Sequence, residues 1–160
     1  MIISKEKCLE IIKKVELDSK WESRKFKKTI SYQTTFFPID IELETQFKDY
    51  CKNNLKLDVL DVNLNVLKYE VGDVFARHID QDPNIEKNSD WLYNINFRLN
   101  DDYEGGEFYL NDELFHKPVG EVYHYKSTEY HEVKPITKGI RYSALFYVTF
   151  RNTKNEKSII

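Results

Sequence analysis

A histidine and an aspartate stand two residues apart in the triplet His78-Ile79-Asp80, which is expected to lie in a strand or at its end. In an extended chain, residues i and i+2 share a face, so this imidazole and carboxylate project to the same side about 7 Å apart. A divalent metal ion can bind between them. Because 27 of the 160 residues are acidic, such triplets also arise by chance, and a surface ion pair is the ordinary explanation of one taken alone.

A third ligand would change that interpretation. His131 lies in a strand-like run over 129–133, far enough beyond Asp80 for several strands to intervene and return the chain. Two histidines and one carboxylate leave half of an octahedron open, which is diagnostic of non-haem Fe(II) oxygenases, whereas a fourth protein ligand more often closes a zinc site. His116 and His124 are alternative third ligands, although His124 is expected to pack within a strand and His116 to lie at a hairpin.

An arginine on the strand-like run over 140–150 is the candidate anion-binding residue. One face of that run consists of Arg141, Ser143, Leu145 and Tyr147. A guanidinium in a largely apolar pocket needs an anion, and its planar fork fits a carboxylate with two parallel hydrogen bonds. A structural salt bridge from Arg141 to Glu107 or Glu129 is the alternative.

The elements that must position these residues begin with two amphipathic helices. Ser4 can cap the first, whose apolar residues recur at helical spacing: Cys8, Ile11, Ile12 and Val15. The second begins near Asp40, with the buried stripe Leu43, Phe47, Tyr50 and Leu55. Residues 21–37 are expected to form a loop that leads into an irregular strand. Its basic cluster is interpreted as a solvated face, with contact to an anionic partner as the alternative: Arg24, Lys25, Lys27 and Lys28.

After Asp58 the pattern changes from helical to alternating. Leu60, Val62, Leu64 and Val66 point to one side of a strand, and Asn63, Asn65, Leu67 and Tyr69 to the other. The same division recurs over 93–99, where the polar face is Asn94, Asn96 and Arg98. Such strands pack helices on one face and line a pocket with the other. Further strand-like runs at 107–110, 119–125, 129–133 and 140–150 predict an α+β domain, mainly β, of sandwich or barrel type.

Composition limits the class of protein. A chain of 160 residues that is 41% hydrophobic is expected to form one domain, with 1–57 as helical support, 58–150 as the barrel and 151–160 as a frayed tail. The net charge of −3 argues against nucleic acid as the main partner. Two cysteines form no disulfide framework, no apolar run could span a bilayer, and the N-terminus lacks a signal-peptide pattern. A soluble, cytoplasmic protein without a membrane partner is expected.

Four blocks of sequence resemble the prolyl-4-hydroxylase-like branch of the 2-oxoglutarate and Fe(II)-dependent dioxygenases. They are YEVG at 69–72, HID at 78–80, LNDDYEGGE at 99–107 and HEVKPITKGIRYS at 131–143. The resemblance covers roughly residues 58 to 150. It implies a double-stranded β-helix, a jelly-roll or cupin-like barrel with the metal near its open end and the N-terminal helices packed on one sheet.

The resemblance also implies roles for individual residues. It makes His78, Asp80 and His131 the iron ligands, with no catalytic residue beyond them. Arg141 would hold the distal carboxylate of 2-oxoglutarate, Tyr69 would line the same pocket, and Ser143 would be a second donor. The chain departs from the family pattern at Arg98 and Asn96, both on the predicted pocket face, and these are the candidate substrate-binding residues.

The implied activity is hydroxylation of a prolyl residue in a peptide or protein, with a proline-rich partner as one candidate. Fe(II), 2-oxoglutarate and O2 are the expected cofactor and cosubstrates, with ascorbate as a further candidate. Residues 81–91 are expected to form a substrate-selecting loop, and Trp91, Tyr93 and Tyr103 could offer aromatic surface to the peptide. The alternatives are a hydroxylase of a free amino acid, another side chain or a nucleobase, favoured by a buried Arg98 that points at the metal, and a non-catalytic jelly-roll binding protein.

Overall fold

A computed structural model of the chain describes residues 1–18, 20–81, 93–150 and 158–159. Its elements follow in this order: α1 (Lys5–Asp18), β1 (Glu22–Phe26), β2 (Ile30–Phe37), α2 (Ile41–Tyr50), a π-helical turn (Cys51–Leu55), β3 (Val59–Tyr69), β4 (Val74–His78), β5 (Tyr93–Arg98), β6 (Glu104–Gly105), β7 (Phe108–Leu110), β8 (Glu113–Leu114), β9 (Tyr123–Lys126), β10 (His131–Val133), β11 (Ile136–Lys138), β12 (Arg141–Phe150) and β13 (Ser158–Ile159). No helix among these described ranges has the length and apolar character to cross a membrane.

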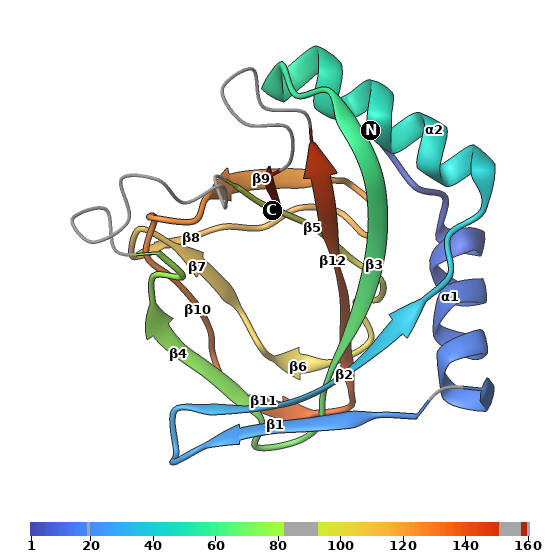
Figure 1. Cartoon of the computed structure of the whole chain (residues 1–160). Coiled ribbons are helices and arrows are strands. Elements are labelled where there is room, and N and C mark those ends of the chain that lie inside the picture. Colours follow the sequence, from blue (N-terminus) through green and yellow to red (C-terminus); the bar gives the residue numbers. More distant parts are fainter. Residues whose placement is uncertain (19, 82–92, 151–157, 160) are drawn as a thin grey trace.

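Ser4 caps α1 as the sequence predicts, and α2 begins after Asp40, where the second helix is expected to start. The Lys7 backbone N–H donates to Ser4 Oγ at 3.1 Å, and the Leu43 N–H donates to Asp40 Oδ1 at 2.8 Å, which satisfies groups that the first helical turn leaves unpaired. The apolar stripes of α1 and α2 pack together with one face of the sheet in the larger hydrophobic core. Figure 1 shows the two helices gathered on one side of the curled sheet.

The strands form a curled, mainly β architecture that encloses an interior. One antiparallel sheet runs in the order β8-β7-β10-β4-β2-β3-β12-β5-β9, with β1 added to β2 and β13 to β12, while β6 and β11 form a separate pair. In Figure 1 the sheet bends around so that β4 and β10 face β3 and β12 across the barrel. The expected jelly-roll barrel with helices on one sheet is confirmed.

The central pair β3 and β12 divides its side chains as the alternating pattern predicts. Val62, Leu64 and Val66 are buried against the helices, whereas Asn65, Leu67 and Tyr69 line the interior. Tyr69 pairs directly with Arg141 in the ladder. Leu60 departs from its predicted side and is 36% exposed, because the register shifts where Val59 pairs with Phe150 and a shifted strand turns its side chains over.

Three predicted segments need correction. The expected strand within residues 21–37 is β2, but the expected loop before it contains a further strand, β1, with Glu22 paired to Thr34 and Phe26 to Ile30. The run over 119–125 is a strand only from Tyr123, since Gly120 adopts φ +79°. Within the expected tail, Ser158–Ile159 pair with β12. The rest of that tail, Trp91 and nearly all of the expected 81–91 loop lie outside the described residues.

Candidate metal centre and its cavity

The two histidines and the aspartate predicted as ligands come together at the edge of the interior. His78 ends β4 and pairs directly with His131 on β10, and Asp80 follows two residues after His78. Their candidate ligand atoms all lie within 4.8 Å of one another, and no fourth His, Cys, Asp or Glu joins the group among the described residues. His116 is exposed and His124 bonds to Tyr50 Oη at 2.7 Å, so neither alternative third ligand belongs to the cluster.

Each member of the cluster is oriented by a second contact. The Nδ1 atoms of His78 and His131 lie 2.8 Å and 3.0 Å from the carbonyl oxygens of Ala76 and Glu129, each two residues earlier in the chain. An imidazole that donates through Nδ1 presents the lone pair of Nε2. Both Nε2 atoms accordingly face Asp80, at 3.2 Å and 3.4 Å from its two oxygens. Asn94 on β5 donates to Asp80 Oδ2 at 2.6 Å and so fixes the carboxylate.

This arrangement fits a divalent metal ion. The His78 Nε2 atom is buried and makes no hydrogen bond, which is costly unless a ligand is present. Burial raises the pKa of Asp80. The contact with His78 and the charge of His131 together outweigh that effect, so the pKa lies below its usual 3.8. Burial lowers the pKa of His131 below 6.5. Near neutral pH the cluster therefore offers an ionised carboxylate and an unprotonated imidazole, as metal binding requires.

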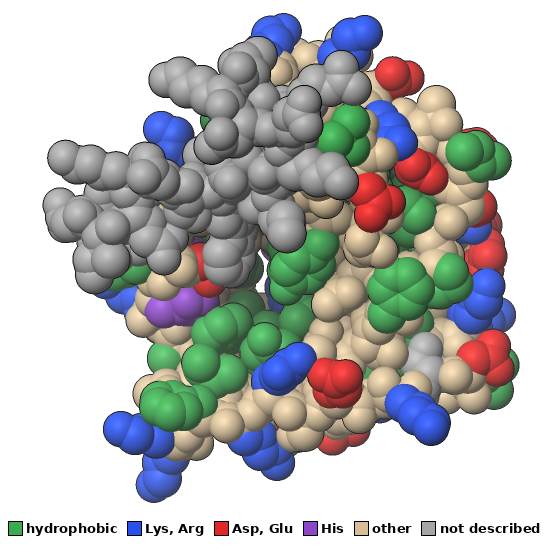
Figure 2. Space-filling view, in the orientation of Figure 1, with side chains coloured by type: hydrophobic (Ala, Val, Ile, Leu, Met, Phe, Trp, Pro, Cys, Tyr) green, Lys and Arg blue, Asp and Glu red, His purple; other side chains and the backbone are tan. Residues whose placement is uncertain are grey.

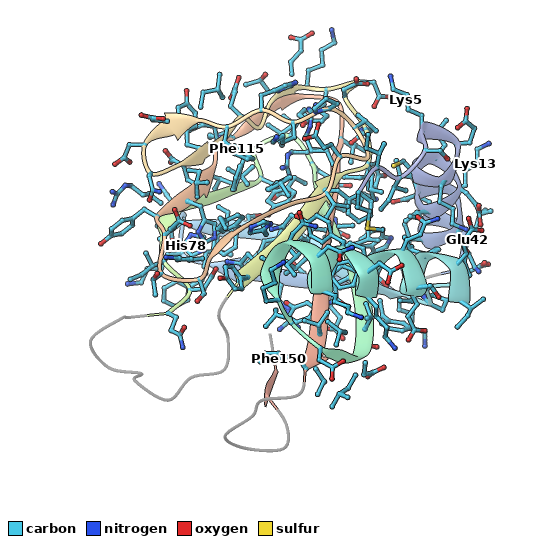
Figure 3. All side chains as sticks on the ribbon, turned by 90° about the horizontal axis from the view of Figure 1, so that it is seen from above. Lys5, Lys13, Glu42, His78, Phe115 and Phe150 are labelled. Atoms are coloured by element: carbon cyan, nitrogen blue, oxygen red, sulfur yellow. The ribbon has the colours of Figure 1, made fainter. Side chains whose placement is uncertain are left out.

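A cavity of about 370 Å³ opens from this cluster into the barrel. Its lining includes Arg141 with Tyr69, Tyr123, Val133 and Ser143, and two members of the cluster, Asp80 and His131, with Asn94, Asn96 and Tyr125. Figure 2 shows the face hollowed between hydrophobic side chains, with a histidine to one side. In the view from above in Figure 3, the labelled His78 lies on the side of the barrel away from α1. The cavity volume is of the size that holds small organic ligands.

Arg141 stands in this cavity as a buried cation without a counter-ion. Arg141 is 2% exposed. Its guanidinium donates to Ser143 Oγ at 3.0 Å and lies 5.3 Å from the centre of the Tyr69 ring. The Nε atom has no partner, and no carboxylate among the described residues forms an ion pair with Arg141. The alternative of a salt bridge to Glu107 or Glu129 is therefore not observed, and an unpaired buried charge of this kind calls for an anionic ligand.

The two candidate substrate-binding residues on β5 separate in the structure. Asn96 lines the cavity, and its buried Nδ2 atom has no partner. Arg98 is absent from the cavity lining, because its guanidinium donates to the Lys117 carbonyl at 2.9 Å and to Tyr103 Oη at 3.2 Å. The role of Arg98 in substrate binding stays a prediction, and these bonds aim its guanidinium at Lys117 and Tyr103. Tyr103 and Tyr93 are likewise absent from the lining.

Comparison with known proteins identifies the family of the chain that contains this cavity. The profile of the 2OG-Fe(II) oxygenase superfamily matches residues 64–149. The chain belongs to that superfamily. Among curated proteins, this 2OG-Fe(II) oxygenase is similar to a PKHD-type hydroxylase of Delftia acidovorans, with 33% identity over 113 residues, 64% of this chain and 49% of that protein. A PKHD-type hydroxylase of Aliarcobacter butzleri is 33% identical over 91 residues, 51% of this chain and 40% of its own length.

The chain thus spans about half the length, or less, of these curated relatives. Solved structures share the fold of the 2OG-Fe(II) oxygenase chain. A Pseudomonas putida prolyl-4-hydroxylase superposes with a TM-score of 0.66 at 14% identity, covering 90% of this chain and 84% of that one. A viral collagen prolyl hydroxylase from Paramecium Bursaria Chlorella virus-1 gives a TM-score of 0.61 at 15% identity, covering 90% and 91%.

Sequence reasoning missed two groups that the fold brings to the cavity. Asn94 was placed on the correct face of its strand, but its bond to Asp80 depends on how the chain returns after residue 81 and has no local signal. Arg24 and Tyr32 line the cavity because residues 22–37 form a hairpin. The sequence ESRKF at 22–26 has no alternation of polar and apolar residues and all five residues are exposed, so no local signal indicates a strand there.

Proposed function

We propose that this chain is an Fe(II)- and 2-oxoglutarate-dependent hydroxylase that oxidises a prolyl residue of a peptide or protein, with O2 as cosubstrate and ascorbate as a candidate accessory reductant. The observation that carries the proposal is the placement of two complementary binding groups in one cavity. Two members of the His78, Asp80 and His131 cluster, Asp80 and His131, line the cavity, and the uncompensated Arg141 lines the same cavity.

His78, Asp80 and His131 are the proposed ligands of Fe(II), and Arg141 is the proposed partner of the distal carboxylate of 2-oxoglutarate. When bound, this iron and cosubstrate supply the oxidising chemistry, which couples activation of O2 to decarboxylation of the 2-oxo acid. Ser143 accepts a hydrogen bond from Arg141 and thereby fixes the guanidinium for bidentate contact. Tyr69 packs against the same guanidinium and completes the cosubstrate pocket in this proposal.

The chain's own residues orient the ligands and exclude water. The carbonyls of Ala76 and Glu129 hold the two imidazole rings with Nε2 inward, and Asn94 holds the carboxylate. Aromatic rings pack tightly around the cluster: Phe75 stacks on His78 with centroids 3.9 Å apart, and Tyr125 lies 4.8 Å from His131. Such a wall keeps bulk water from a reactive centre and fixes the geometry on which the reaction depends.

The prolyl substrate is the finer part of the proposal and is supported by the fold shared with a prolyl-4-hydroxylase and a viral collagen prolyl hydroxylase. The alternative of a small anionic substrate depended on a buried Arg98 aimed at the metal, and Arg98 is instead bonded to Lys117 and Tyr103. The alternative of a non-catalytic barrel would have to explain why the Nε atom of Arg141 in the cavity and the Nε2 atom of His78 in the adjoining cluster are both buried without a hydrogen-bond partner.

The test is anaerobic reconstitution with Fe(II) followed by 2-oxoglutarate, with succinate formation in air as the companion measurement. We expect a weak visible charge-transfer band that the variant His131→Ala abolishes. The matched control is His116→Ala, which removes an exposed histidine outside the cluster and should leave the band unchanged. A band that persists in His131→Ala would refute the proposed metal site. If folded wild-type protein shows no band and forms no succinate, the proposal is refuted in favour of a binding protein.

A further inference from the structure

The β1–β2 hairpin turns one of its basic residues toward the cavity and the next one away from it. In the antiparallel register, Arg24 pairs with Tyr32, and directly paired residues share a face of the sheet. Arg24 and Tyr32 both line the cavity. Lys25 follows Arg24 immediately, so its side chain projects to the opposite face. The cluster that was interpreted from sequence as a solvated face is therefore divided between the two sides of a strand.

Two aromatic rings separate Arg24 from Arg141 in the cavity wall. Arg24 pairs with Tyr32, the Tyr32 ring lies 5.4 Å from the Tyr69 ring, and Tyr69 lies 5.3 Å from the Arg141 guanidinium. The Arg24 side chain is 56% exposed, and Tyr147, which also lines the cavity, is 37% exposed, so the cavity opens to solvent beside these residues. Burial raises the pKa of Tyr32, the Arg24 charge lowers it and the Asp80 charge raises it, which places the ring within electrostatic reach of both groups.

The charges of the cavity leave Arg24 available for a ligand. Asp80 is the single carboxylate among the lining residues of the described chain, and Arg24 and Arg141 are the two cations. With Arg141 assigned to the cosubstrate, Arg24 is the cation that remains. Its partner is Glu22, at 2.9 Å in a pair whose side chains are 56% and 70% exposed. Such exposed pairs are weak, so a ligand carboxylate can replace Glu22.

The hairpin carries a net positive charge, whereas the chain as a whole carries a net negative charge. Residues 22–28 carry Arg24, Lys25, Lys27 and Lys28 against Glu22 alone, whereas the chain has a net charge of −3. A local basic arm beside the opening concentrates anionic partners there. Arg24 forms no further hydrogen bond or ion pair with the described residues beyond Glu22. Its position thus serves no evident structural purpose within the described part of the chain.

We propose that Arg24 is a specificity-determining residue that binds the side-chain carboxylate of an acidic residue next to the oxidised residue of a peptide substrate. This inference rests on the proposed function, because it assigns Arg141 to 2-oxoglutarate and the solvent-exposed side of the cavity at Arg24 to the peptide. The exposed rings of Tyr147, which lines the same cavity, and of Phe26, two residues after Arg24 on the same face of β1, are the proposed contacts for the apolar parts of that peptide.

The test measures binding of short peptides, acetylated and amidated at their ends, in which a central proline is flanked by Glu, Gln or Lys. Their dissociation constants are obtained by fluorescence anisotropy with the chain loaded anaerobically with Fe(II) and 2-oxoglutarate. We expect the Glu peptide to bind wild type about tenfold more tightly than the Lys peptide, as for one partly exposed charge-assisted hydrogen bond. Arg24→Gln should reduce the ratio to less than about twofold, and Arg24→Glu should invert it.

Lys25→Gln is the matched control, since it removes the same charge from the opposite face of the same strand and should retain the preference. Equal loss in both variants would mean that the general field of the hairpin acts, and it would overturn the assignment to Arg24. So would an equal affinity of wild type for the Glu and Lys peptides, or a preference that survives in Arg24→Gln. Competition by free proline that depends on Arg24 would assign the site to an α-carboxylate and overturn the peptide part.

The charge-transfer band, recorded before any peptide is added, separates the two proposals. A normal band without a preference for acidic peptides refutes the role of Arg24 and leaves the proposed function standing. Absence of the band from folded wild-type protein refutes the proposed function, whatever the peptides do. Thermal unfolding of Arg24→Gln provides the check on folding, and an exposed pair of this kind should contribute little to stability.

Discussion

Replacement of Arg141 by methionine should move stability and cosubstrate binding in opposite directions. Without a ligand, the guanidinium is a buried cation that meets Ser143 Oγ and the Tyr69 ring but no carboxylate of the described chain. Methionine retains the apolar stem that packs beside Gly106 and removes the charge. Replacing buried charges by apolar groups of similar volume stabilises proteins by about 1–4 kcal/mol. The contacts with Ser143 and Tyr69 offset part of the gain, so we expect about 1–2 kcal/mol.

For a domain of this size, about 1 kcal/mol corresponds to a shift in Tm of about 2–4 °C. Arg141→Met without ligand should therefore melt about 2–8 °C above wild type. With 2-oxoglutarate the order reverses, because the variant leaves the distal carboxylate buried without a partner. A loss of about 3 kcal/mol or more is typical of such unpaired charges, which corresponds to an affinity at least about a hundredfold weaker.

The assay is thermal unfolding of both proteins over a titration of 2-oxoglutarate, with Mn²⁺ in place of Fe²⁺ to prevent turnover. Saturation to about one hundred times the wild-type Kd should stabilise wild type by about 2.7 kcal/mol and the variant by no more than about 0.4 kcal/mol at the same concentration. Ser143→Ala is the milder control, because it removes one hydrogen bond and keeps the charge. A ligand-free variant that melts below wild type, or one that 2-oxoglutarate stabilises equally, would refute the account of Arg141 as an uncompensated cation.

Two further predictions concern Asp80 in the metal cluster and His124, which bonds to Tyr50. Asp80→Ala should remove tight binding of divalent metal while the fold is retained, because the three ligands lie at the edge of the barrel and not in its main core. Metal content after dialysis measures the first effect and the circular dichroism spectrum the second. Insoluble protein would count against this prediction. Burial lowers the pKa of His124 below 6.5 in the folded protein. As the pH falls below 6.5, the unfolded chain therefore takes up a proton at His124 before the folded protein does. The contribution of His124 to stability is complete above pH 6.5 and is lost as the pH falls below that value. Urea unfolding of wild type and His124→Gln should accordingly show a stability difference that narrows between pH 7.5 and pH 5.5, and a difference independent of pH would contradict the assignment.

The sequence predicts the parts of this molecule whose signals are local. Ser4 marks the start of the first helix through capping chemistry, and the alternation assigns each face of β3 from Val62 to Tyr69, although not at Leu60. The interior placement of Asn96 follows from the same alternation. The grouping of His78, Asp80 and His131 could be inferred only through the family resemblance, because spacing along the chain does not show where a strand returns.

The errors arose where tertiary contacts determine the outcome. The β1–β2 hairpin contains four lysines and arginines within 22–28, a composition typical of loops, yet it forms because β2 pairs with both β3 and β4. Arg98 follows the alternating pattern of its strand. Its long side chain nevertheless reaches past the cavity to the Lys117 carbonyl and to His116, and alternation specifies the face of a residue but not the end point of a flexible side chain.

The position of β12 between β3 and β5 in the sheet has a consequence for how the chain acquires its structure during synthesis. β3 and β5 leave the ribosome well before β12, and each then exposes an unpaired edge and an apolar face. Such edges invite association with other chains, and non-local pairing of this kind is slow to form. The insertion of residues 141–150 therefore closes the sheet, and the same event delivers Arg141 to the interior. Anion recognition and protection from aggregation are acquired together, in one late step of folding.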